Sequence, residues 1–320
     1  MDVLVIGGNR YFGKRLIALL RESGHRITVL NRGSSGVPEG IEHLVADRDD
    51  EAALESALAG RSFDVVVDQV CYTPRQAEIA RRVFGTRARR YVMTSTVEVY
   101  EYEDSAEPVA ESALDLDAVV VDTGPAWDDP EFREAHYGEG KRQAEAVFAA
   151  GTPFAWTSVR VAHVLGGADD FTGRLDHYAR RVRAGEPIAV PAVNRPATYV
   201  YVEEIAAFLA WTVEAEFTGP VNAHSHGPLT TAEICAEMER QVGGRTVFQE
   251  VEVGEVSPFS FARSYAMDNS RATGLGYSFT HSGEWLARAV AETVGGSGGA
   301  PVGAAGASGV VDGAVGGSGE

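Results

Sequence analysis

The sequence predicts an α/β protein: a doubly wound parallel sheet of the Rossmann-like kind, followed by a smaller mixed α/β portion. Three observations predict this class. Short apolar runs alternate with amphipathic segments over residues 1–165, which is typical of parallel strands that helices cover on both faces. The first run, Val3–Ile6, leads directly into a glycine-rich loop. After Gly166 the alternation becomes irregular, which indicates a second portion of different architecture.

The first portion is expected to alternate strands with helices. The strands are the Val-, Ile- and Leu-rich runs, namely Val3–Ile6, Arg26–Asn31, Glu42–Ala46, Asp64–Asp68, Arg90–Thr94 and Phe154–Val161. The helices are the amphipathic segments Lys14–Ser23, Glu51–Ala59, Pro74–Phe84 and His136–Ala149. The acidic, irregular segment Leu114–Pro130 precedes the last helix. It is either a lid or entrance loop, or a solvated surface insertion.

The remainder of the chain divides into two parts. Residues 166–293 are expected to form the smaller portion, packed over the carboxyl ends of the parallel strands. Its helices are Phe171–Ala184, Glu203–Glu214, Thr231–Val242 and Glu284–Glu292, and its strands are Ile188–Val190, Thr198–Val202, Pro220–Ala223 and Thr246–Val251. Residues 294–320 are rich in Gly and Ala without periodicity, so we expect a disordered tail.

Composition excludes several classes of function. The net charge of −18 argues against a nucleic-acid partner, because phosphate binding needs a basic surface. Cys71 and Cys235 lack CxxC spacing and are expected to be reduced thiols of a cytoplasmic protein. Neither His-x-His nor HExxH spacing is expected among the histidines, so no metal is expected. No stretch approaches the roughly 20 apolar residues of a membrane span, so no membrane partner is expected.

The glycine-rich loop runs Gly7-Gly8-Asn9-Arg10-Tyr11-Phe12-Gly13 between the first strand and the first helix. Such a loop lets backbone N–H groups at a helix N-terminus approach a pyrophosphate. The run Ile27–Leu30 follows and ends where a dinucleotide-binding unit keeps the group that reads its ribose. The sequence therefore predicts a dinucleotide site. The alternative is an ordinary strand–helix unit with a glycine turn.

Tyr137 and Lys141 lie four residues apart in a predicted helix, so their side chains share one face. A free tyrosine has a pKa of about 10, and a nearby lysine cation lowers it. Such a pair can act as a general acid and base near neutral pH. Alone, the spacing is more often a turn of a surface helix.

Over about residues 1–293 the chain resembles an extended short-chain dehydrogenase/reductase of the NAD-dependent epimerase/dehydratase type. Gly7 and Gly13 fit two glycines of that family's Gly-x-x-Gly-x-x-Gly loop, while Arg10 stands where the middle glycine belongs. This departure resembles an atypical branch that includes uncharacterised bacterial reductases and chloroplast stem-loop-binding proteins. An arginine there must point away or bind phosphate itself. The resemblance implies cofactor binding by Gly7, Arg10, Phe12 and Gly13, and a substrate-binding role for residues 166–293.

The resemblance also implies a catalytic group of three residues. In Thr94-Ser95-Thr96-Val97-Glu98-Val99-Tyr100, Thr96 falls on the family's catalytic Ser/Thr. Thr96 would orient a substrate oxygen, Tyr137 would exchange its proton, and Lys141 would lower the pKa of Tyr137 and bind the nicotinamide ribose. The alternative for Thr96 is an ordinary Thr-rich strand end. Glu98 alone retains part of the acid/base pair of a dehydratase.

Four further residues are expected to lie beside the cofactor. No carboxylate lies in Asn31-Arg32-Gly33, where NAD-preferring relatives carry an acid. Asn31 and Arg32 are therefore expected at the cofactor ribose, with Arg32 pairing with a 2′-phosphate, so NADPH is expected to be preferred, with NAD as the alternative. Asp47 would meet the adenine or else precede a helix. His163 would lie near the nicotinamide or substrate, as a second proton donor or as a packed neutral histidine.

The resemblance therefore implies an NAD(P)-dependent oxidoreductase that transfers hydride between nicotinamide and a carbonyl or carbinol carbon of a small molecule. One alternative is an epimerase of sugar nucleotides with a tightly bound cofactor. Its diphosphate ligands would come from Arg174, Arg180, Arg181, Arg183 or Arg195. Another alternative is a non-catalytic dinucleotide sensor or RNA-binding protein. The resemblance also implies a homodimer formed through the helix that carries Tyr137 and Lys141.

Overall fold

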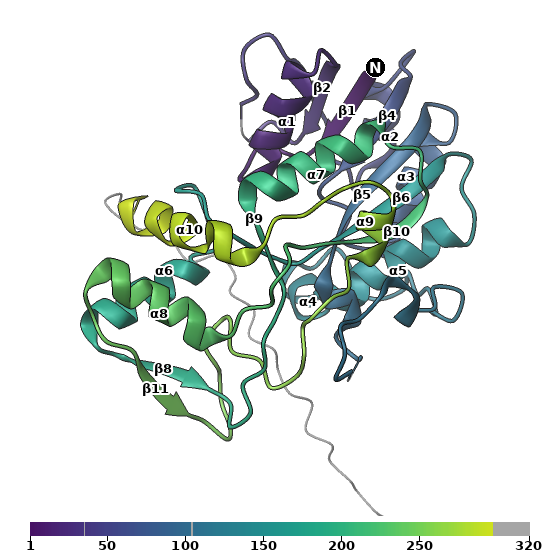
Figure 1. Ribbon diagram of the computed structural model, residues 1–320. Coiled ribbons are helices and arrows are strands. Elements are labelled where there is room, and N and C mark those ends of the chain that lie inside the picture. Colours follow the sequence, from purple (N-terminus) through teal and green to yellow (C-terminus); the bar gives the residue numbers. More distant parts are fainter. Residues whose placement is uncertain (35, 104, 297–320) are drawn as a thin grey trace, which may run out of the picture.

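The computed structural model describes residues 1–296 except residues 35 and 104. A parallel sheet dominates it, with strands in the order β10-β6-β5-β4-β1-β2-β3 (Figure 1). The order runs outward in both directions from the β1–β4 pair, which confirms the predicted doubly wound class. The strands are β1 (Asp2–Ile6), β2 (Arg26–Asn31), β3 (Glu42–Val45), β4 (Phe63–Asp68), β5 (Ala88–Thr96), β6 (Ala155–Val161) and β10 (Gly219–Ala223).

Two apolar layers enclose this sheet. Val3 and Val5 of β1 belong to the core shared with α1 (Phe12–Glu22) and α7 (Val202–Glu214). Leu4 and Ile6, which alternate with them, belong to a second core. Its helices are α3 (Pro74–Phe84) and α5 (Tyr137–Ala149), with α2 (Glu51–Ala57) beside α3. Because both faces are covered, these strands read as nearly continuous apolar runs in the sequence.

The smaller portion has its own short sheets. β7 (His163–Leu165) pairs with β9 (Tyr199–Tyr201), and β8 (Pro187–Val190) pairs with β11 (Val247–Glu250). The helices α6 (Arg174–Ala184), α8 (Thr231–Val242) and α10 (Ser282–Gly296) pack against one another. Figure 1 shows this group below the main sheet. The remaining elements are η1 (Val97–Tyr100), η2 (Glu111–Ala113), α4 (Pro130–Ala135) and α9 (Ser270–Gly274).

Three of the differences from the expectations concern β10, the start of α6 and the end of α10. β10, which comes from the later part of the chain, joins the main sheet beside β6. α6 begins at Arg174 because Gly173 has φ 65°, a left-handed conformation that starts the helix there. The predicted tail is wrong for residues 294–296, which continue α10 because Val294 packs against the main core. The rest of the predicted disordered tail lies outside the described residues.

The segment Leu114–Pro130 is irregular, as expected, but it is anchored to α5. Trp127 is buried beside this helix, and its indole N–H donates to the carbonyl oxygen of Asp122 at 2.9 Å. The backbone N–H of Asp122 in turn donates to Gln143 of α5 at 2.8 Å. Arg75 of α3 adds an ion pair of 2.8 Å with Asp128. The outward side of α5 is therefore covered by its own chain.

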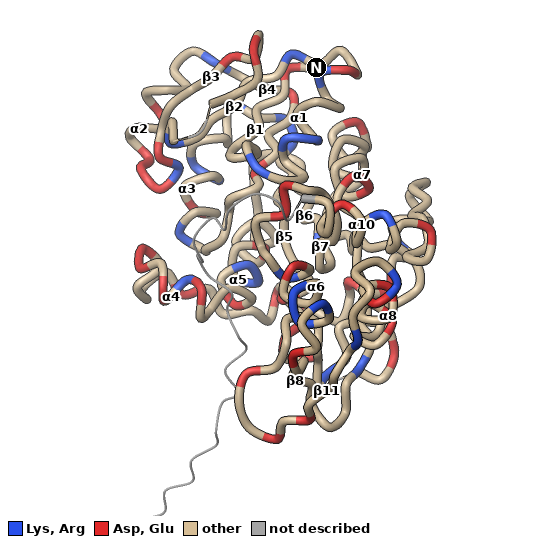
Figure 2. The backbone as a smooth tube through the Cα atoms, turned by 90° about the vertical axis from the view of Figure 1, so that its left-hand side faces the viewer, with Lys and Arg blue, Asp and Glu red and all other residues tan. Residues whose placement is uncertain are grey.

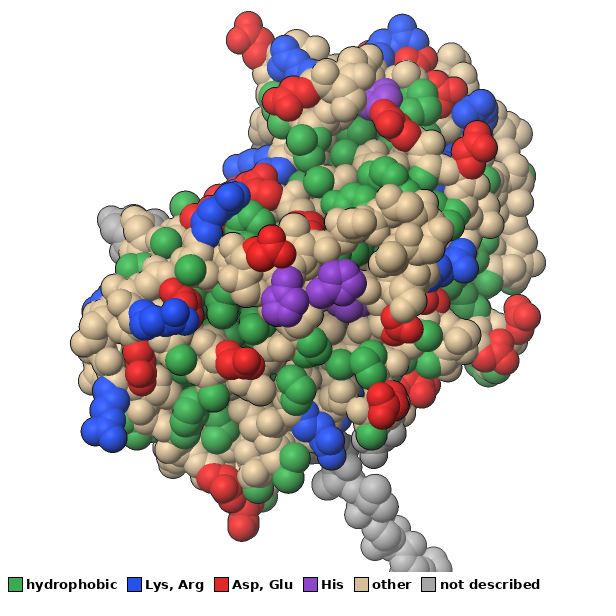
Figure 3. All heavy atoms as spheres, in the orientation of Figure 1, with side chains coloured by type: hydrophobic (Ala, Val, Ile, Leu, Met, Phe, Trp, Pro, Cys, Tyr) green, Lys and Arg blue, Asp and Glu red, His purple; other side chains and the backbone are tan. Residues whose placement is uncertain are grey.

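Charges are spread over both portions of the molecule. Figure 2 shows acidic residues along the helices and loops of each portion, with Lys and Arg between them. The face in Figure 3 likewise intersperses acidic, basic and hydrophobic side chains. In the part of the chain that the structure describes, we find no helix with both the length and the apolar character needed to cross a bilayer.

Candidate active site

The carboxyl end of β5 positions Thr96. The strand ends there because the chain turns into η1, and the Thr96 hydroxyl caps that turn by accepting a hydrogen bond from the Glu98 N–H at 3.2 Å. Thr96 is buried between the ends of β4 and β6. This is the edge at which doubly wound sheets bind their ligands.

Helix α5 brings Tyr137 to this edge. Tyr137 is the first residue of the helix, and Gly138 follows it. A Cβ atom on Gly138 would lie 2.6 Å from the Glu98 carbonyl oxygen, so only glycine lets α5 approach η1 this closely. The Tyr137 ring packs at 6.2 Å from the ring of Tyr72. The Thr96 side chain acts to lower the pKa of Tyr137.

Lys141 is buried one helical turn further along. Its Nζ donates to the carbonyl oxygen of Thr94 at 2.7 Å. The same atom lies 4.5 Å from the Tyr72 ring centre and 5.8 Å from that of Tyr137. Burial lowers the pKa of Lys141 to about 8, so the lysine is still mainly a cation at neutral pH. Thr96, Tyr137 and Lys141, which the sequence singled out, are thus brought together.

The pKa of Tyr137 differs from the expectation. Although 37% of its surface is exposed, desolvation raises its pKa above the usual range, and the Tyr72 hydroxyl adds to this, while hydrogen bonding with Thr96 opposes it. The predicted net lowering of the Tyr137 pKa is therefore wrong for this structure, because desolvation outweighs the effect of the Lys141 cation. The lysine is bound to the Thr94 carbonyl and faces the Tyr72 ring more closely than the Tyr137 ring. Tyr137 is therefore a protonated phenol at neutral pH.

Glu98 faces the smaller portion of the molecule. Its carboxylate accepts a hydrogen bond of 3.0 Å from the Tyr265 hydroxyl and lies 3.6 Å from Arg263. Arg263 also donates to the Tyr100 carbonyl oxygen at 3.0 Å. Burial raises the pKa of Glu98, and Arg263 opposes that rise. Sequence reasoning missed Arg263 and Tyr265, because they lie in an irregular segment far along the chain that no motif marks.

His163 is buried in the same region. Its ring stacks on Phe261 at 5.1 Å with an angle of 7° between the planes. Its Nδ1 lies 3.4 Å from Arg174 Nη1, and its Nε2 has no hydrogen-bond partner within the described residues. Burial lowers the pKa of His163 to about 3, and the charges of Arg174 and Arg263 act in the same direction. The ring is therefore neutral, as in the second of the two expectations for it.

The glycine loop has the predicted form. Gly7 has φ 81°, and its N–H donates to the Leu30 carbonyl oxygen at 2.9 Å. A Cβ atom on Gly13 would lie 2.6 Å from the Cα of Gly8, so only glycine allows this turn. The loop leads into the N-terminus of α1, where the Gly13 and Lys14 N–H groups donate to the Arg10 and Tyr11 carbonyl oxygens. The positive end of the helix dipole favours an anion there.

Arg10 is exposed and points away from the loop. Its guanidinium carbon lies 5.9 Å from the ring centre of Phe171, which precedes α6. The next residue, Tyr11, is buried with φ 51°, and its hydroxyl donates to the Gly166 carbonyl oxygen at 2.6 Å. Phe12 begins α1 and packs against Tyr11 at 5.9 Å. The loop is therefore tied to the start of the smaller portion.

The residues expected around the cofactor ribose and adenine lie at strand ends. Asn31 accepts a hydrogen bond of 2.7 Å from the Gly33 N–H, while Arg32 is exposed. Asp47 is exposed after β3 and accepts a hydrogen bond of 3.0 Å from the Asp49 N–H. The cap of α2 is a different residue, Asp50, which accepts from Ala53 at 3.0 Å.

Sequence reasoning also missed residues beside the loop. A Cβ atom on Gly13 would lie 2.5 Å from Gln69 Oε1, and the buried Nε2 of Gln69 has no partner within the described residues. A small cavity adjoins the loop and is lined by Gly8, Asn9, Lys14, Ile17, Gly36 and Pro38. No sequence motif marks Gln69, which follows β4 where its side chain can cover the loop.

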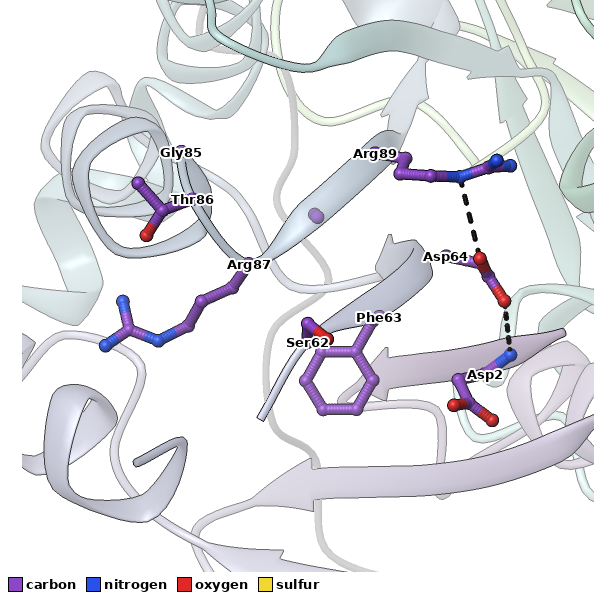
Figure 4. A pocket seen from close by; sticks show the side chains of 9 residues that line it. Asp2, Ser62, Phe63, Asp64, Gly85, Thr86, Arg87 and Arg89 are labelled. Carbon is purple, nitrogen blue, oxygen red and sulfur yellow. Dashed lines mark hydrogen bonds and ion pairs between the residues drawn. The ribbon is translucent and has the colours of Figure 1, made fainter. Parts of the chain in front are cut away.

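Two other features lie apart from this group. A second cavity opens at the amino ends of β1, β4 and β5 (Figure 4), and is lined by Asp2, Ser62, Phe63, Asp64, Gly85, Thr86, Arg87, Ala88 and Arg89. His224 and His226 are two residues apart, so the expectation of no His-x-His spacing is wrong. In the described part of the chain, no three His, Cys, Asp or Glu residues are grouped to hold a metal ion.

Comparison with known proteins is consistent with this geometry. The model of the NAD dependent epimerase/dehydratase family matches residues 3–224. A 3-diazoavenalumate denitrifying reductase from Streptomyces is 26% identical over 311 residues, covering 88% of this chain and 97% of the reductase. A chloroplast stem-loop binding protein of 41 kDa from Arabidopsis thaliana is 26% identical over 206 residues, covering 59% of this chain but 48% of that relative. The chain thus matches about half the length of the latter protein.

Solved structures share the fold. A UDP-glucose 4-epimerase from Thermotoga maritima, solved with UDP-glucose, has a TM-score of 0.70 at 19% identity, covering 92% of this chain and 99% of that one. The enzyme WbmG of Bordetella bronchiseptica, solved with NAD, has a TM-score of 0.68 at 18% identity, covering 92% and 93%. The family model covers most of the chain, from the glycine loop through the Tyr137 helix to β10, and the chain therefore belongs to the NAD dependent epimerase/dehydratase family.

Proposed function

We propose that this protein is an NAD(P)-dependent oxidoreductase that reduces a carbonyl group of a small molecule. One observation carries the proposal: Gly138 lets α5 approach η1, so that Tyr137 and Lys141 lie beside Thr96 at the ligand-binding edge of the sheet. A hydroxyl, a phenol and a buried cation in one place are the groups that proton transfer to a carbonyl oxygen needs.

The residues of the glycine loop fit a dinucleotide. A Cβ atom on Gly7 would collide with Val70 and one on Gly13 with Gly8, so glycine at both positions keeps the turn tight. The turn leads into the N-terminus of α1, whose dipole favours an anion. Gln69 adds a buried side-chain N–H without a partner in the described part of the chain. We propose that these groups hold the pyrophosphate. When bound, a reduced nicotinamide would supply the hydride.

The protein's own residues handle the proton. Desolvation keeps Tyr137 protonated at neutral pH, so in the reductive direction it donates its proton to the carbonyl oxygen. Thr96 donates a hydrogen bond to the same oxygen and orients it. The Lys141 cation, 5.8 Å from the Tyr137 ring centre, stabilises the phenolate left after the transfer. A raised pKa suits the acid of a reduction better than the base of an oxidation, so we propose reduction as the favoured direction.

NADPH is the proposed cofactor. No carboxylate lies in Asn31-Arg32-Gly33 to bind a ribose diol, and Arg32 is exposed at the end of β2. A guanidinium there can pair with a 2′-phosphate. WbmG, which shares the fold at 18% identity, was solved with NAD, so the preference is to be tested directly by turnover with each cofactor.

Sugar-nucleotide epimerisation is the second candidate, because the Thermotoga epimerase shares the fold. The arginines expected to bind a diphosphate do not converge, however. Arg180 pairs with Asp176 at 2.8 Å, and Arg181 donates to the Pro187 carbonyl oxygen at 2.7 Å. Arg183 and Arg195 are exposed. Arg174 alone lies beside His163, so we place reduction before epimerisation.

The test is a screen of aldehydes, ketones and UDP-sugars with the purified protein, following NADPH absorbance and product stereochemistry together. Net NADPH consumption with a carbonyl compound supports the proposal. Interconversion of UDP-sugars without net consumption would support the epimerase. Binding of NADPH with no turnover of any compound would instead support a non-catalytic dinucleotide sensor.

A further inference from the structure

Arg174 and His163 form a group that the proton-transfer mechanism does not use. Arg174 begins α6, and its guanidinium lies 5.6 Å from the Phe259 ring centre. It forms no ion pair with any residue that the structure describes, and its buried Nε has no hydrogen-bond partner there. Asp170 and Glu98 act on it electrostatically but do not contact it. A half-buried cation without a carboxylate contact is costly unless a ligand supplies the negative charge.

The contact with Arg174 also fixes the role of each His163 nitrogen. A guanidinium can only donate hydrogen bonds, so Nδ1, at 3.4 Å from Arg174, is the acceptor. In a neutral imidazole the other nitrogen, Nε2, then carries the hydrogen. This N–H is buried and has no partner within the described residues. Among the described residues, the Nε2–H group is thus a second free hydrogen-bond donor beside the Arg174 guanidinium.

The surrounding charged residues limit the negative charge that a ligand of this group can carry. Arg263 is already engaged by Glu98 at 3.6 Å and by the Tyr100 carbonyl oxygen at 3.0 Å. Its guanidinium also stacks on the Tyr265 ring at 3.8 Å. Arg174 therefore remains as a single positive charge in need of a partner. One negative charge with two oxygens matches a guanidinium and one N–H donor, whereas a diphosphate would require further cations.

The walls of this group are aromatic. The His163 ring lies 5.1 Å from Phe261, 6.1 Å from Phe259 and 5.4 Å from Tyr265. Such walls favour a flat apolar body next to the charged end of a ligand. The same Arg174 charge acts on Tyr137, so the anion-binding group and the proton donor lie within electrostatic reach of each other.

We propose that Arg174 and His163 bind the carboxylate of an aromatic carboxylic acid substrate. Arg174 forms an ion pair with this carboxylate, and the Nε2–H of His163 donates a hydrogen bond to it. The proposal deepens the proposed function, since it names the substrate class of that same site. It rests on the reductase proposal only for the reaction, because carboxylate binding can be measured without turnover.

The test measures equilibrium binding by calorimetry to the protein saturated with NADP⁺. The probes are benzoate, phenylacetate and cinnamate, each with its methyl ester and amide, and UDP. We expect at least one carboxylate to bind tenfold or more tightly than its ester and amide. Arg174→Gln should lose that preference, while Arg180→Gln, on the same helix but paired with Asp176, should keep it. His163→Gln, which retains an N–H donor, should bind the carboxylate more tightly than His163→Phe.

Three results would overturn this assignment: no carboxylate binds, ester and acid bind equally, or Arg174→Gln leaves the preference intact. Tight UDP binding that Arg174→Gln abolishes would assign the group to a diphosphate instead. Circular dichroism of each variant shows whether it is folded. Failure of NADPH turnover together with intact carboxylate discrimination would reject the reductase proposal and leave this one standing.

Discussion

A Cβ atom on Gly140 would lie 2.4 Å from the carbonyl oxygen of Tyr72. The helix that carries Tyr137 and Lys141 therefore touches the loop after β4 backbone to backbone, with no space for a side chain. Because a carbonyl oxygen in a packed loop cannot rotate away, any larger residue must displace the helix. The position of Tyr137 and Lys141 relative to Thr96 thus depends on Gly140, which has no side chain.

Gly140→Ala should lower the free energy of unfolding by about 1–3 kcal/mol, as overpacking does. Turnover should fall further than stability alone explains, because α5 moves relative to Thr96. Gly274→Ala is the matched control, since a Cβ atom there meets nothing within 4 Å. Urea unfolding and steady-state kinetics on both variants test this. Equal effects of the two substitutions would contradict the packing argument.

Tyr137→Phe should lower kcat by about 10²–10⁴-fold, the usual contribution of general acid catalysis. The KM for the cofactor should not change, because the phenol is not proposed to hold it. Tyr102→Phe is the control, since Tyr102 is 74% exposed and its ring packs on Arg142. A Tyr137→Phe protein with wild-type kcat would remove the proposed proton donor from the mechanism.

Lys141 should give the protein a distinct dependence on pH. Its folded pKa of about 8 lies below the usual 10.5, so the unfolded chain binds more protons between these values. Its contribution therefore raises stability as pH rises through this window, by up to about 1.4 kcal/mol per pH unit. Activity should fall over the same window as the cation that stabilises the Tyr137 phenolate is lost.

Lys141→Met isolates this group. The difference in unfolding free energy between wild type and Lys141→Met should change between about pH 8 and 10.5 and be flat below it. Other titrating groups cancel in the difference because both proteins contain them. Denaturant unfolding at several pH values gives the curve, and a difference that does not vary with pH would show that Lys141 is not shifted.

Arg32→Glu should shift the cofactor preference from NADPH toward NADH. A carboxylate at the end of β2 repels a 2′-phosphate and accepts hydrogen bonds from a ribose diol. We expect the ratio of kcat/KM for the two cofactors to change by at least about tenfold, which corresponds to about 1.4 kcal/mol. Arg89→Glu, near the amino end of β5, should leave the ratio unchanged. A wild-type preference for NADH would reject the NADPH proposal outright.

The protein should not dimerise through α5. Trp127 and its neighbours cover the outward side of that helix, where Gln143 and Arg142 are already buried. Sedimentation velocity at micromolar concentration should therefore show no α5-dependent dimer. A dimer dispersed by substituting exposed residues of another surface is consistent with this. One dispersed by changes on the covered side of α5 would contradict it.

The sequence predicts features that depend on neighbouring residues, but not contacts between residues that are far apart in the chain. The strands of the first portion were predicted because each is a local apolar run, and Thr96 and Tyr137 because motifs mark them. Arg263 and Tyr265 could not be found, since their meeting with Glu98 depends on packing between segments more than 160 residues apart. The pKa of Tyr137 was missed for a related reason, because desolvation depends on neighbours such as Tyr72 that only the fold provides.

The position of β10 late in the sequence affects when the main sheet can be completed during synthesis. Because β10 pairs with β6 along Thr157–Val161, the main sheet remains open until residue 223 has been synthesised. A fragment that stopped at residue 165 would leave β6 as a bare edge, with the apolar Val159 and Val161 without their cover. Such an edge invites pairing with a second chain. We therefore expect residues 1–165 to be poorly soluble when expressed alone, because they need β10 to complete their sheet.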